Sequence, residues 1–341
     1  MSKVFFAELK KLLKLQHLLL VFIIALSVRT VLCFVPIAHD HPYYYEVYRQ
    51  YTTMLSGELT SEKIESLNAR LAEIQSLIAD YDNMQQKYQS GEIDLSEYSD
   101  FTSRHGIAKA EEKTVMYLCE KYAKLNECSG FEKQIFCDTD WADLFADNSY
   151  DHIMLIALLC IAVPAFDSEF SSGSFAQILT SKRGRTQTAF AKLFAVSLAV
   201  FVLSLLMSAA RLGVFAYRNS LGFSDKAAGN LLLTDLLGDT TLLGYYITDA
   251  LLKALAFVFY ALAACAVSIA CKNVTFSFAL SFLACVTPLF VLNDSGNVLI
   301  CASVLNRMYG GFSAVRFAIV SCVKSVVGCY TAVVLWRRKQ K

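Results

Sequence analysis

Three basic side chains interrupt apolar stretches of this 341-residue chain: Arg29, Lys253 and Lys324. Each lies several residues inside a run long enough to cross a membrane, where an unsheltered charge costs on the order of a few kcal/mol or more. The three residues are therefore candidates for a polar translocation path or gate between helices. For Lys253 a second interpretation stays open, because Asp249 lies one helical turn before it and can form a local ion pair with it.

Residues 167–186 form a second polar group, placed between two apolar stretches. Asp167 and Glu169 open it, where acidic side chains complement the dipole of a short helix. Gly173 and Ser174 allow another backbone to approach closely. Four residues give this helix an apolar face: Phe170, Phe175, Ile178 and Leu179. A basic group ends the segment at the level of lipid headgroups: Lys182, Arg183 and Arg185.

The common catalytic and nucleotide-binding motifs are missing from the sequence. It has no phosphate-binding G-x-x-x-x-G-K-[ST] loop, no G-x-S-x-G elbow and no H-E-x-x-H helix. Its basic residues are also not interleaved with aromatic residues as in nucleic-acid-binding surfaces. We therefore expect no catalytic residue, no cofactor bound by this chain and no nucleic-acid partner. The protein is not expected to be an enzyme.

The spacing of cysteines and histidines predicts no metal site. Eight of the 11 cysteines lie in or beside apolar runs, where thiols behave as small hydrophobic groups. Cys119, Cys128 and Cys137 lie nine residues apart, which does not fit the paired ligands of a structural zinc site. One disulfide with one thiol left over and three reduced thiols are both open. His39 and His41 flank Asp40 in what we interpret as a turn at a membrane edge.

The composition places the chain among membrane proteins, because 55% of its residues are hydrophobic and 18% are charged. Hydropathy predicts six transmembrane helices, since one span needs about 20 apolar residues. Their approximate bounds are 16–37, 150–166, 187–212, 246–270, 275–292 and 313–336. The expected fold class is an all-α membrane protein, in which 150–341 holds the five spans that follow the first.

Basic residues predict the orientation of these spans. The following lysines and arginines all fall on one side of a six-span arrangement: Lys3, Lys10, Lys11, Lys14, Lys182, Arg183, Arg185, Lys192, Lys272, Arg337, Arg338, Lys339 and Lys341. An excess of Lys and Arg marks the cytoplasmic side of a membrane. Both termini are therefore expected in the cytoplasm, in a multi-pass protein of the plasma membrane.

The acidic segment 38–149 is expected on the outside of the cell. It holds 21 Asp and Glu residues against 10 Lys and Arg residues. Apolar residues at steps of three and four, from Ile64 to Tyr81 and from Phe101 to Leu125, predict two helices in an antiparallel hairpin. A structural cap and an adaptor or substrate-contacting stalk are both open interpretations of this hairpin.

Three further segments flank or connect the predicted spans. Residues 1–15 are expected to form an amphipathic helix at the lipid interface, with a disordered basic tail as the alternative. Residues 218–245 are expected to be an outer loop with short interfacial helices. Residues 293–312 are expected to form a re-entrant hairpin, which a membrane protein tolerates where other protein covers the backbone.

The polar segment has a recognisable pattern: Glu169, Gly173-Ser174, Ile178-Leu179, Arg183 and Arg185, followed by Lys192 at the next apolar run. This pattern resembles the permease subunits of ABC transporters of the type 2 exporter class. Those proteins carry a Glu, a Gly-Thr, a Leu-Leu pair, a Ser-Pro-x-x-Arg turn and a Lys that opens the next span. Here Ser174 stands in place of Thr, and Lys182 stands where Pro is frequent, so the turn is less constrained. The pattern covers about 26 residues.

The resemblance implies that loop 167–186 is a coupling helix that docks on a separate ATPase subunit, which binds ATP and Mg²⁺. The docking residues that it implies are Glu169, Phe170, Gly173, Ser174, Arg183 and Arg185, with Glu169 as the polar anchor and Gly173 as the point of close contact. A second permease copy or a paralogue, surrounded by membrane lipid, would complete the transporter. The alternative function is a membrane-anchored sensor or interaction protein that works through its acidic outer hairpin.

Overall fold

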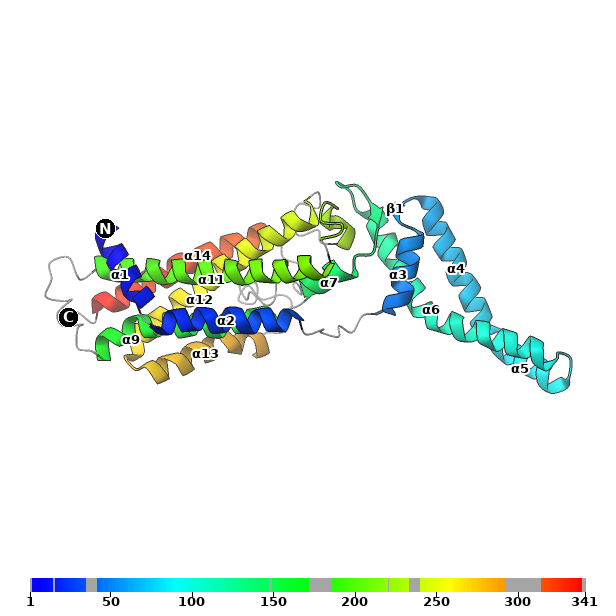
Figure 1. Ribbon diagram of the computed structural model, residues 1–341, viewed down its shortest axis with the longest axis horizontal. Helices are drawn as coiled ribbons and strands as arrows, with labels where there is room; N and C mark the ends of the chain where they lie inside the picture. The colour runs from blue at the N-terminus through cyan, green and yellow to red at the C-terminus, as the bar shows by residue number, and fades with distance from the viewer. Residues whose placement is uncertain are drawn as a thin grey trace. The chain divides into compact units, whose positions relative to one another are not determined.

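The computed structural model describes residues 2–14, 16–34, 42–146, 149–171, 186–219, 221–232, 240–291 and 314–338. The chain is mostly helical, which confirms the all-α expectation at this level. It divides into two compact units, and most of their helices are labelled in Figure 1. Unit 1 comprises Met1–Pro36, Phe145–Leu221 and Gly244–Lys341, and unit 2 comprises Ile37–Leu144 and Gly222–Leu243.

Unit 1 is a bundle of helices. They are α1 (Ser2–Lys14), α2 (Gln16–Phe34), α8 (Ser149–Ala162), α9 (Pro164–Ser171), α11 (Gln187–Asn219), α12 (Leu242–Cys271), α13 (Val274–Val291) and α14 (Ala314–Arg338). Helix α11 packs against α1, α2, α8 and α14, and α8 packs against α2 and α13 (Figure 1). The ring of Phe5 in α1 lies 5.1 Å from that of Phe194 in α11, so an aromatic contact joins these two helices.

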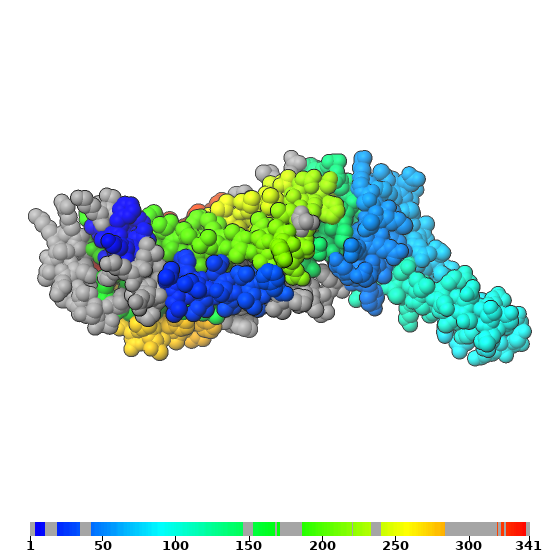
Figure 2. All heavy atoms as spheres, viewed as in Figure 1, coloured from blue at the N-terminus to red at the C-terminus, as the bar shows by residue number. Residues whose placement is uncertain are grey.

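The helices of unit 1 are apolar on exposed as well as buried faces. Helix α2, blue in Figure 2, exposes Leu19, Leu20, Ile23, Ile24, Val28, Val31 and Phe34. Helix α11 exposes Phe190, Phe194, Leu198, Val202 and Leu206, at steps of four residues. Helices that are apolar all round are typical of a membrane or of a large protein core. In α11 the buried and exposed apolar faces lie on one helix, as lipid on one side and protein on the other would require.

Two helices of the described chain are long and apolar enough to cross a membrane by length and composition: α11 and α12. Shorter apolar stretches lie at Leu19–Phe34, Ile153–Asp167 and Val274–Leu283. The six predicted spans coincide roughly with α2, α8, α11, α12, α13 and α14, but a count of six stays a prediction. The predicted re-entrant hairpin at 293–312 lies outside the described residues.

The second predicted span, 150–166, is not one continuous helix. Helix α8 ends at Ala162 and α9 begins at Pro164, with Val163 as a turn residue between them. Proline has no backbone N–H and its ring crowds the preceding turn, so it suits the first position of a new helix. Hydropathy alone therefore does not reveal the break between α8 and α9. The predicted bounds differ also at α11, which continues to Asn219, and at α12, which begins at Leu242.

Unit 2 contains α3 (Tyr45–Met54), α4 (Ser61–Ala79), α5 (Tyr81–Ser90), α6 (Leu95–Glu127), the start of α7 (Thr139–Ala146) and the 3₁₀ helix η1 (Ala228–Leu231). Both α4 and α5 pack against α6. The side chains of Thr60 and Asp94 cap α4 and α6 by accepting hydrogen bonds from backbone N–H groups. Gly91 ends α5 in the left-handed region, at a φ of 77°.

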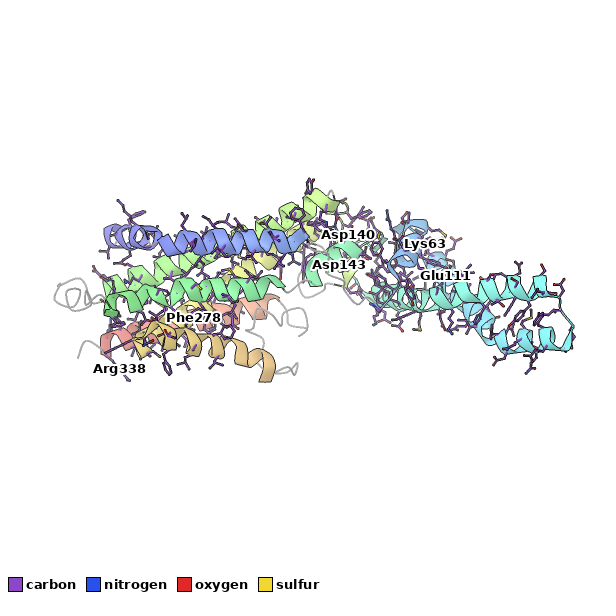
Figure 3. The ribbon with its side chains drawn as sticks, turned by 60° about the horizontal axis from the view of Figure 1, so that its bottom comes forward. Lys63, Glu111, Asp140, Asp143, Phe278 and Arg338 are labelled. Carbon is purple, nitrogen blue, oxygen red and sulfur yellow. The ribbon has the colours of Figure 1, made fainter. Side chains whose placement is uncertain are left out.

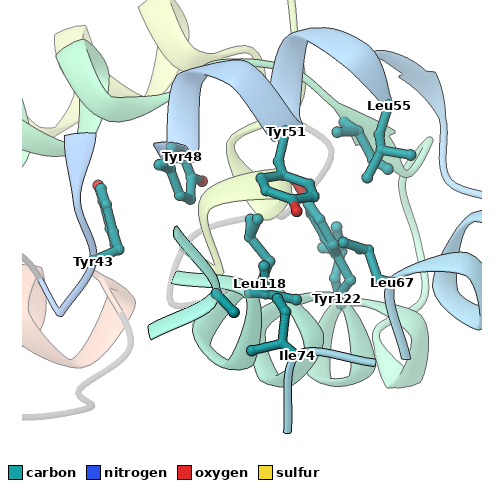
Figure 4. Packing of buried hydrophobic residues seen from close by; sticks show 12 residues of the cluster. Tyr43, Tyr48, Tyr51, Leu55, Leu67, Ile74, Leu118 and Tyr122 are labelled. Atoms are coloured by element: carbon teal, nitrogen blue, oxygen red, sulfur yellow. The ribbon is translucent and has the colours of Figure 1, made fainter. Parts of the chain in front are cut away.

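The core of unit 2 lies where α3, α4 and α6 meet (Figure 4). Helix α4 contributes Leu67 and Ile74, and α6 contributes Leu118 and Tyr122. Tyr48 comes from α3 and is almost fully buried. Residues of both predicted apolar seams thus share one core, because the steps of three and four keep them on one face of each helix.

Two short strands, β1 (Gly57–Glu58) and β2 (Gln134–Ile135), pair antiparallel in unit 2. At the start of α4, Lys63 donates hydrogen bonds to the carbonyls of Ser56, at 3.0 Å, and Glu58, at 2.9 Å (Figure 3). The lysine therefore fixes the turn that leads from β1 into α4.

Most of the segment 218–245, predicted to be an outer loop with short interfacial helices, belongs to unit 2 as Gly222–Leu243. The indole N–H of Trp141 donates to the carbonyl of Gly222 at 2.7 Å, and the ring of Phe136 lies 5.1 Å from that of Phe223. Gly229 packs so closely on Phe131 that a Cβ atom would lie 2.3 Å from the ring. The domain expected at 38–149 is therefore completed by a second stretch of chain. Periodicity could not predict this, because the joining contacts are single side chains.

Candidate functional site

The polar segment 167–186 begins within α9, and the structure describes it up to Ser171 and again at Thr186. Glu169 and Phe170 are therefore described, together with the buried Asp167. Four implied docking residues, Gly173, Ser174, Arg183 and Arg185, lie outside the described residues. The structure thus shows the beginning of the predicted coupling loop, in the C-terminal part of α9.

Glu169 faces the interior of unit 1. Only 1% of the residue is exposed, and its carboxylate lies 2.5 Å from the ammonium of Lys192 in α11. The expected role of Glu169 as the polar anchor for an ATPase stays a prediction, since here the carboxylate is buried and paired within unit 1. The lysine that opens α11 offers it a buried partner, and a buried charge needs one. The sequence pattern includes Glu169 and Lys192 but does not predict that they form a pair.

Lys192 is the centre of a small buried network. Its ammonium donates to the backbone carbonyl of Ala165 in α9 at 2.9 Å and lies 3.8 Å from the carboxylate of Glu8 in α1. It also lies 5.4 Å from the centre of the Phe166 ring, a cation–π contact. One ammonium therefore joins α1, α9 and α11.

Aromatic contacts hold the other side of α9. The ring of Trp336 in α14 is fully buried and lies edge-on to Phe166, with the ring centres 5.4 Å apart. It also lies 6.0 Å from the ring of Phe170, and the ammonium of Lys272 lies 5.9 Å from that same ring. Phe170, expected to dock on a partner, is half-buried against α14.

The carbonyls at the break between α8 and α9 receive side-chain hydrogen bonds from α12. The hydroxyl of Ser268 donates to the carbonyl of Val163 at 2.8 Å, and the thiol of Cys265 donates to that of Ala162 at 3.6 Å. In a membrane, backbone groups freed at a helix break must be satisfied by neighbouring side chains. Together with the bond from Lys192 to Ala165, these contacts tie the junction to two other helices.

The candidates for a translocation path lie on different helices. Arg29 is fully buried in α2. Lys253 is buried in α12, with its ammonium 3.5 Å from the carboxylate of Asp249, as the local ion-pair interpretation predicts. The backbone of Lys324 is part of α14, but its side chain lies outside the described residues. A path lined by these cations stays a prediction.

A buried polar network in unit 2 was missed by the sequence analysis. The ammonium of Lys121 in α6 forms an ion pair with Asp138, and it donates to the hydroxyl of Tyr48 at 2.8 Å. That hydroxyl in turn donates to Asp138 at 2.6 Å. Burial and the charge of Asp138 raise the pKa of Tyr48 well above its ordinary value, so the phenol stays protonated. One signal was available, because Lys121 interrupts the apolar seam between Leu118 and Tyr122.

A second ion-pair group lies nearer the surface of unit 2. The guanidinium of Arg70 in α4 contacts the carboxylates of Glu111, at 2.9 Å, and Glu73, at 2.8 Å; Glu111 is labelled in Figure 3. The hydroxyl of Tyr51 donates to Glu111 at 2.9 Å and accepts a hydrogen bond from Arg70 at 3.2 Å. This group joins α3, α4 and α6 on the outside of the core.

Neither unit holds a metal-binding arrangement within its described residues, where no three His, Cys, Asp or Glu side chains converge. Cys119, Cys128 and Cys137 are all free thiols in the structure. Cys128 donates to the carbonyl of Lys124 at 3.4 Å, and Cys137 lies 3.5 Å from the hydroxyl of Thr139. These are local contacts with residues two and four positions away in the chain.

Comparison of the chain with known protein families, with curated proteins and with solved structures finds no match. The class of protein therefore rests on the residues and the geometry described above.

Proposed function

We propose that this chain is the membrane-spanning permease subunit of an ATP-driven exporter, related in design to the type 2 class. The observation that carries the proposal is the buried Glu169–Lys192 pair at 2.5 Å. It ties α9, which leads into the basic loop, to α11, a helix long enough to cross a membrane. A movement of that loop would therefore be transmitted from α9 to α11 through the Glu169–Lys192 contact.

The two-segment construction of unit 2 supports the six-span topology. Residues 37–144 follow the first predicted span, and residues 222–243 follow the third. Because both segments build one compact unit, they must lie on the same side of a membrane. An even number of crossings must therefore separate them, as the second and third predicted spans provide. We infer that unit 2 is extracellular and that both termini and the basic loop are cytoplasmic.

The catalytic work of such a transporter belongs to another chain. ATP and Mg²⁺ would bind to a separate ATPase, and Gly173, Ser174, Arg183 and Arg185 would carry the docking. Glu169 and Phe170 would act behind that surface, by joining the loop to α11 and α14. A second permease copy or a paralogue would face this one, and Arg29, Lys253 and Lys324 remain the candidates for a polar path.

The compact fold of unit 2 favours the second candidate function, a membrane-anchored sensor or interaction protein. It has its own apolar core and its own buried Lys121–Asp138 pair. In this case unit 2 makes the functional contacts. The basic loop then has no docking role, and its charge reflects only the excess of Lys and Arg in cytoplasmic segments.

The two functions are separated by a binding experiment on the full-length protein. It is purified with an affinity tag from its native host, and copurifying ATPase is measured. The charge reversal Arg183→Glu with Arg185→Glu should weaken the complex by at least about tenfold, or about 1.4 kcal/mol. The matched control reverses Arg337 and Arg338, two exposed arginines at the end of α14, and should leave the complex intact.

Absence of any ATPase, or equal affinity in both variants, would remove the permease function and favour the sensor. The topology is tested separately by labelling single cysteines in intact cells, in a background without the partly exposed native thiols. A cysteine at Asp94 should react from outside and one at Arg183 should not. Reaction at Arg183 from outside would contradict six spans.

A further inference from the structure

Lys192 has acidic neighbours on two different helices. The carboxylate of Glu169 in α9 is 2.5 Å away, and that of Glu8 in α1 is 3.8 Å away. The side chain of Lys192 is 3% exposed, and those of Glu169 and Glu8 are 1% and 14% exposed. The first carboxylate is within hydrogen-bond distance and the second lies just beyond it. One cation thus has a present partner and a second partner that a small movement would reach.

The helix that carries Glu169 is attached by polar and by aromatic contacts. Val163 separates it from α8 and Pro164 begins it, so no continuous helix transmits torsion across the junction. Its attachments include the Lys192 contacts, the Ser268 hydrogen bond at Val163, the contact of Lys272 with the Phe170 ring, and the ring contacts of Phe166 and Phe170 with Trp336. Aromatic contacts tolerate sliding better than a buried ion pair does, because they are less directional.

We infer that Lys192 is a positioning residue that exchanges partners: Glu169 holds it while α9 lies against α11, and Glu8 takes it over when α9 moves away. The exchange keeps the ammonium paired in both states, which avoids the large cost of an unpaired buried charge. It also makes the junction an element with two discrete arrangements, as a conformational coupling requires. In this exchange α1 supplies the second carboxylate, that of Glu8.

This inference deepens the proposed function, since α9 leads into the loop that would dock on the ATPase. Its first test needs no partner and uses the full-length protein alone in lipid nanodiscs. Hydrogen exchange of the α9 amides reports how often this helix leaves its position. The two carboxylates should then act in opposite directions, because one stabilises the position seen and the other stabilises the alternative.

Glu169→Gln should speed exchange in α9 by about tenfold or more, since it weakens a buried ion pair. Glu8→Gln should slow the same amides by about twofold to fivefold, the range expected for a pair nearer the surface. In a Lys192→Met background, Glu8→Gln should have no further effect. The control Lys10→Gln changes an exposed charge on α1 and should leave α9 unchanged.

Amides of α1 are followed in every variant, so that loss of α1 from its place on α11 is recognised. Exchange of α9 that is unchanged or faster in Glu8→Gln, with α1 still protected, would overturn the inference and make Glu8 a second fixed partner. Opposite shifts without a copurifying ATPase would leave the partner exchange standing and remove the proposed transporter function. The two conclusions therefore fail independently.

Discussion

The side chain of Asn230 serves as a backbone partner for Gln134, which lies 96 residues earlier in the chain. Its carbonyl oxygen accepts the N–H of Gln134 at 2.8 Å, and its amide donates to the carbonyls of Glu132 and Ala227, both at 3.2 Å. The residue is 2% exposed. One buried amide thus completes the hydrogen bonds of two distant stretches and joins the two parts of unit 2.

Two glycine substitutions should change the stability of unit 2 in opposite directions. Gly229→Ala places a Cβ atom 2.3 Å from the ring of Phe131, so packing must shift, at a cost of about 1–3 kcal/mol. Gly106→Ala lies within α6, where no described atom beyond the neighbouring helix backbone lies within 4 Å of the new Cβ. It should add about 0.5–1 kcal/mol, because glycine is a poor helix residue.

Unfolding of unit 2 can be followed through Trp141, one of only two tryptophans in the chain. In a Trp336→Phe background it is the single tryptophan, and its indole is buried against Gly222. Denaturant midpoints of the two glycine variants are then compared with that background. A shift of both variants in the same direction would contradict the packing described at Gly229.

Removal of one partner of the buried pair in unit 2 should be severe. Lys121→Met leaves the carboxylate of Asp138 buried without its cation, which should cost about 3–5 kcal/mol. The double variant Lys121→Met with Asp138→Leu should recover most of that loss, since apolar residues of similar size replace such pairs at little cost. The same Trp141 fluorescence measures both. Equal destabilisation by the single and double variants would show that shape, and not charge, is what this site requires.

Unit 2 should lose stability at alkaline pH. Burial, followed by the charge of Asp138, raises the pKa of Tyr43, Tyr48, Tyr117 and Tyr122. The folded state then holds phenolic protons that the unfolded state releases above its ordinary pKa of about 10. The stabilisation is complete below that pH and falls above it, by up to about 1.4 kcal/mol per pH unit for each tyrosine. Ultraviolet titration should show these phenolates appearing together with the loss of Trp141 fluorescence.

Serine substitutions in unit 1 should separate hydrogen-bonded hydroxyls from buried ones that lack a partner. Ser268→Ala removes the bond to the carbonyl of Val163 and should lower the stability of the purified protein by about 1 kcal/mol. Ser277 and Ser281 are buried in α13, and within the part of the chain that the structure describes neither hydroxyl has a hydrogen-bond partner. Alanine at these two positions should be neutral or stabilising. Thermal unfolding in one detergent compares all three; equal losses would contradict the assigned bonds.

The helical content and several core positions follow from the sequence, because they depend on periodicity. Leu67, Ile74 and Leu118 recur at helical spacing, and all three are buried in unit 2. The caps at Thr60 and Asp94 belong to the same local kind of information, since a short polar side chain bonds a backbone N–H three residues ahead.

Contacts between distant residues do not follow from spacing. The sequence alone favours Glu169 as a polar docking anchor and Lys192 as one of the basic residues on the cytoplasmic side. Their pairing could not be predicted, because burial depends on which helix face α9 turns towards α11. The contribution of Asn230 was missed for the same reason. A single amide in a mixed polar loop carries no periodic signal, although three hydrogen bonds depend on it.

The construction of unit 2 from Ile37–Leu144 and Gly222–Leu243 has a consequence for the order of events during synthesis. When residue 144 leaves the ribosome, Phe131, Phe136 and Trp141 have no partners from the second stretch. Those partners appear only after α8, α9 and α11 have been made. The nascent first stretch must therefore wait with part of its apolar surface uncovered, a stage at which chaperones bind and misfolding begins. Unit 2 can then be completed only if the intervening helices α8, α9 and α11 are placed so that the second stretch reaches the first.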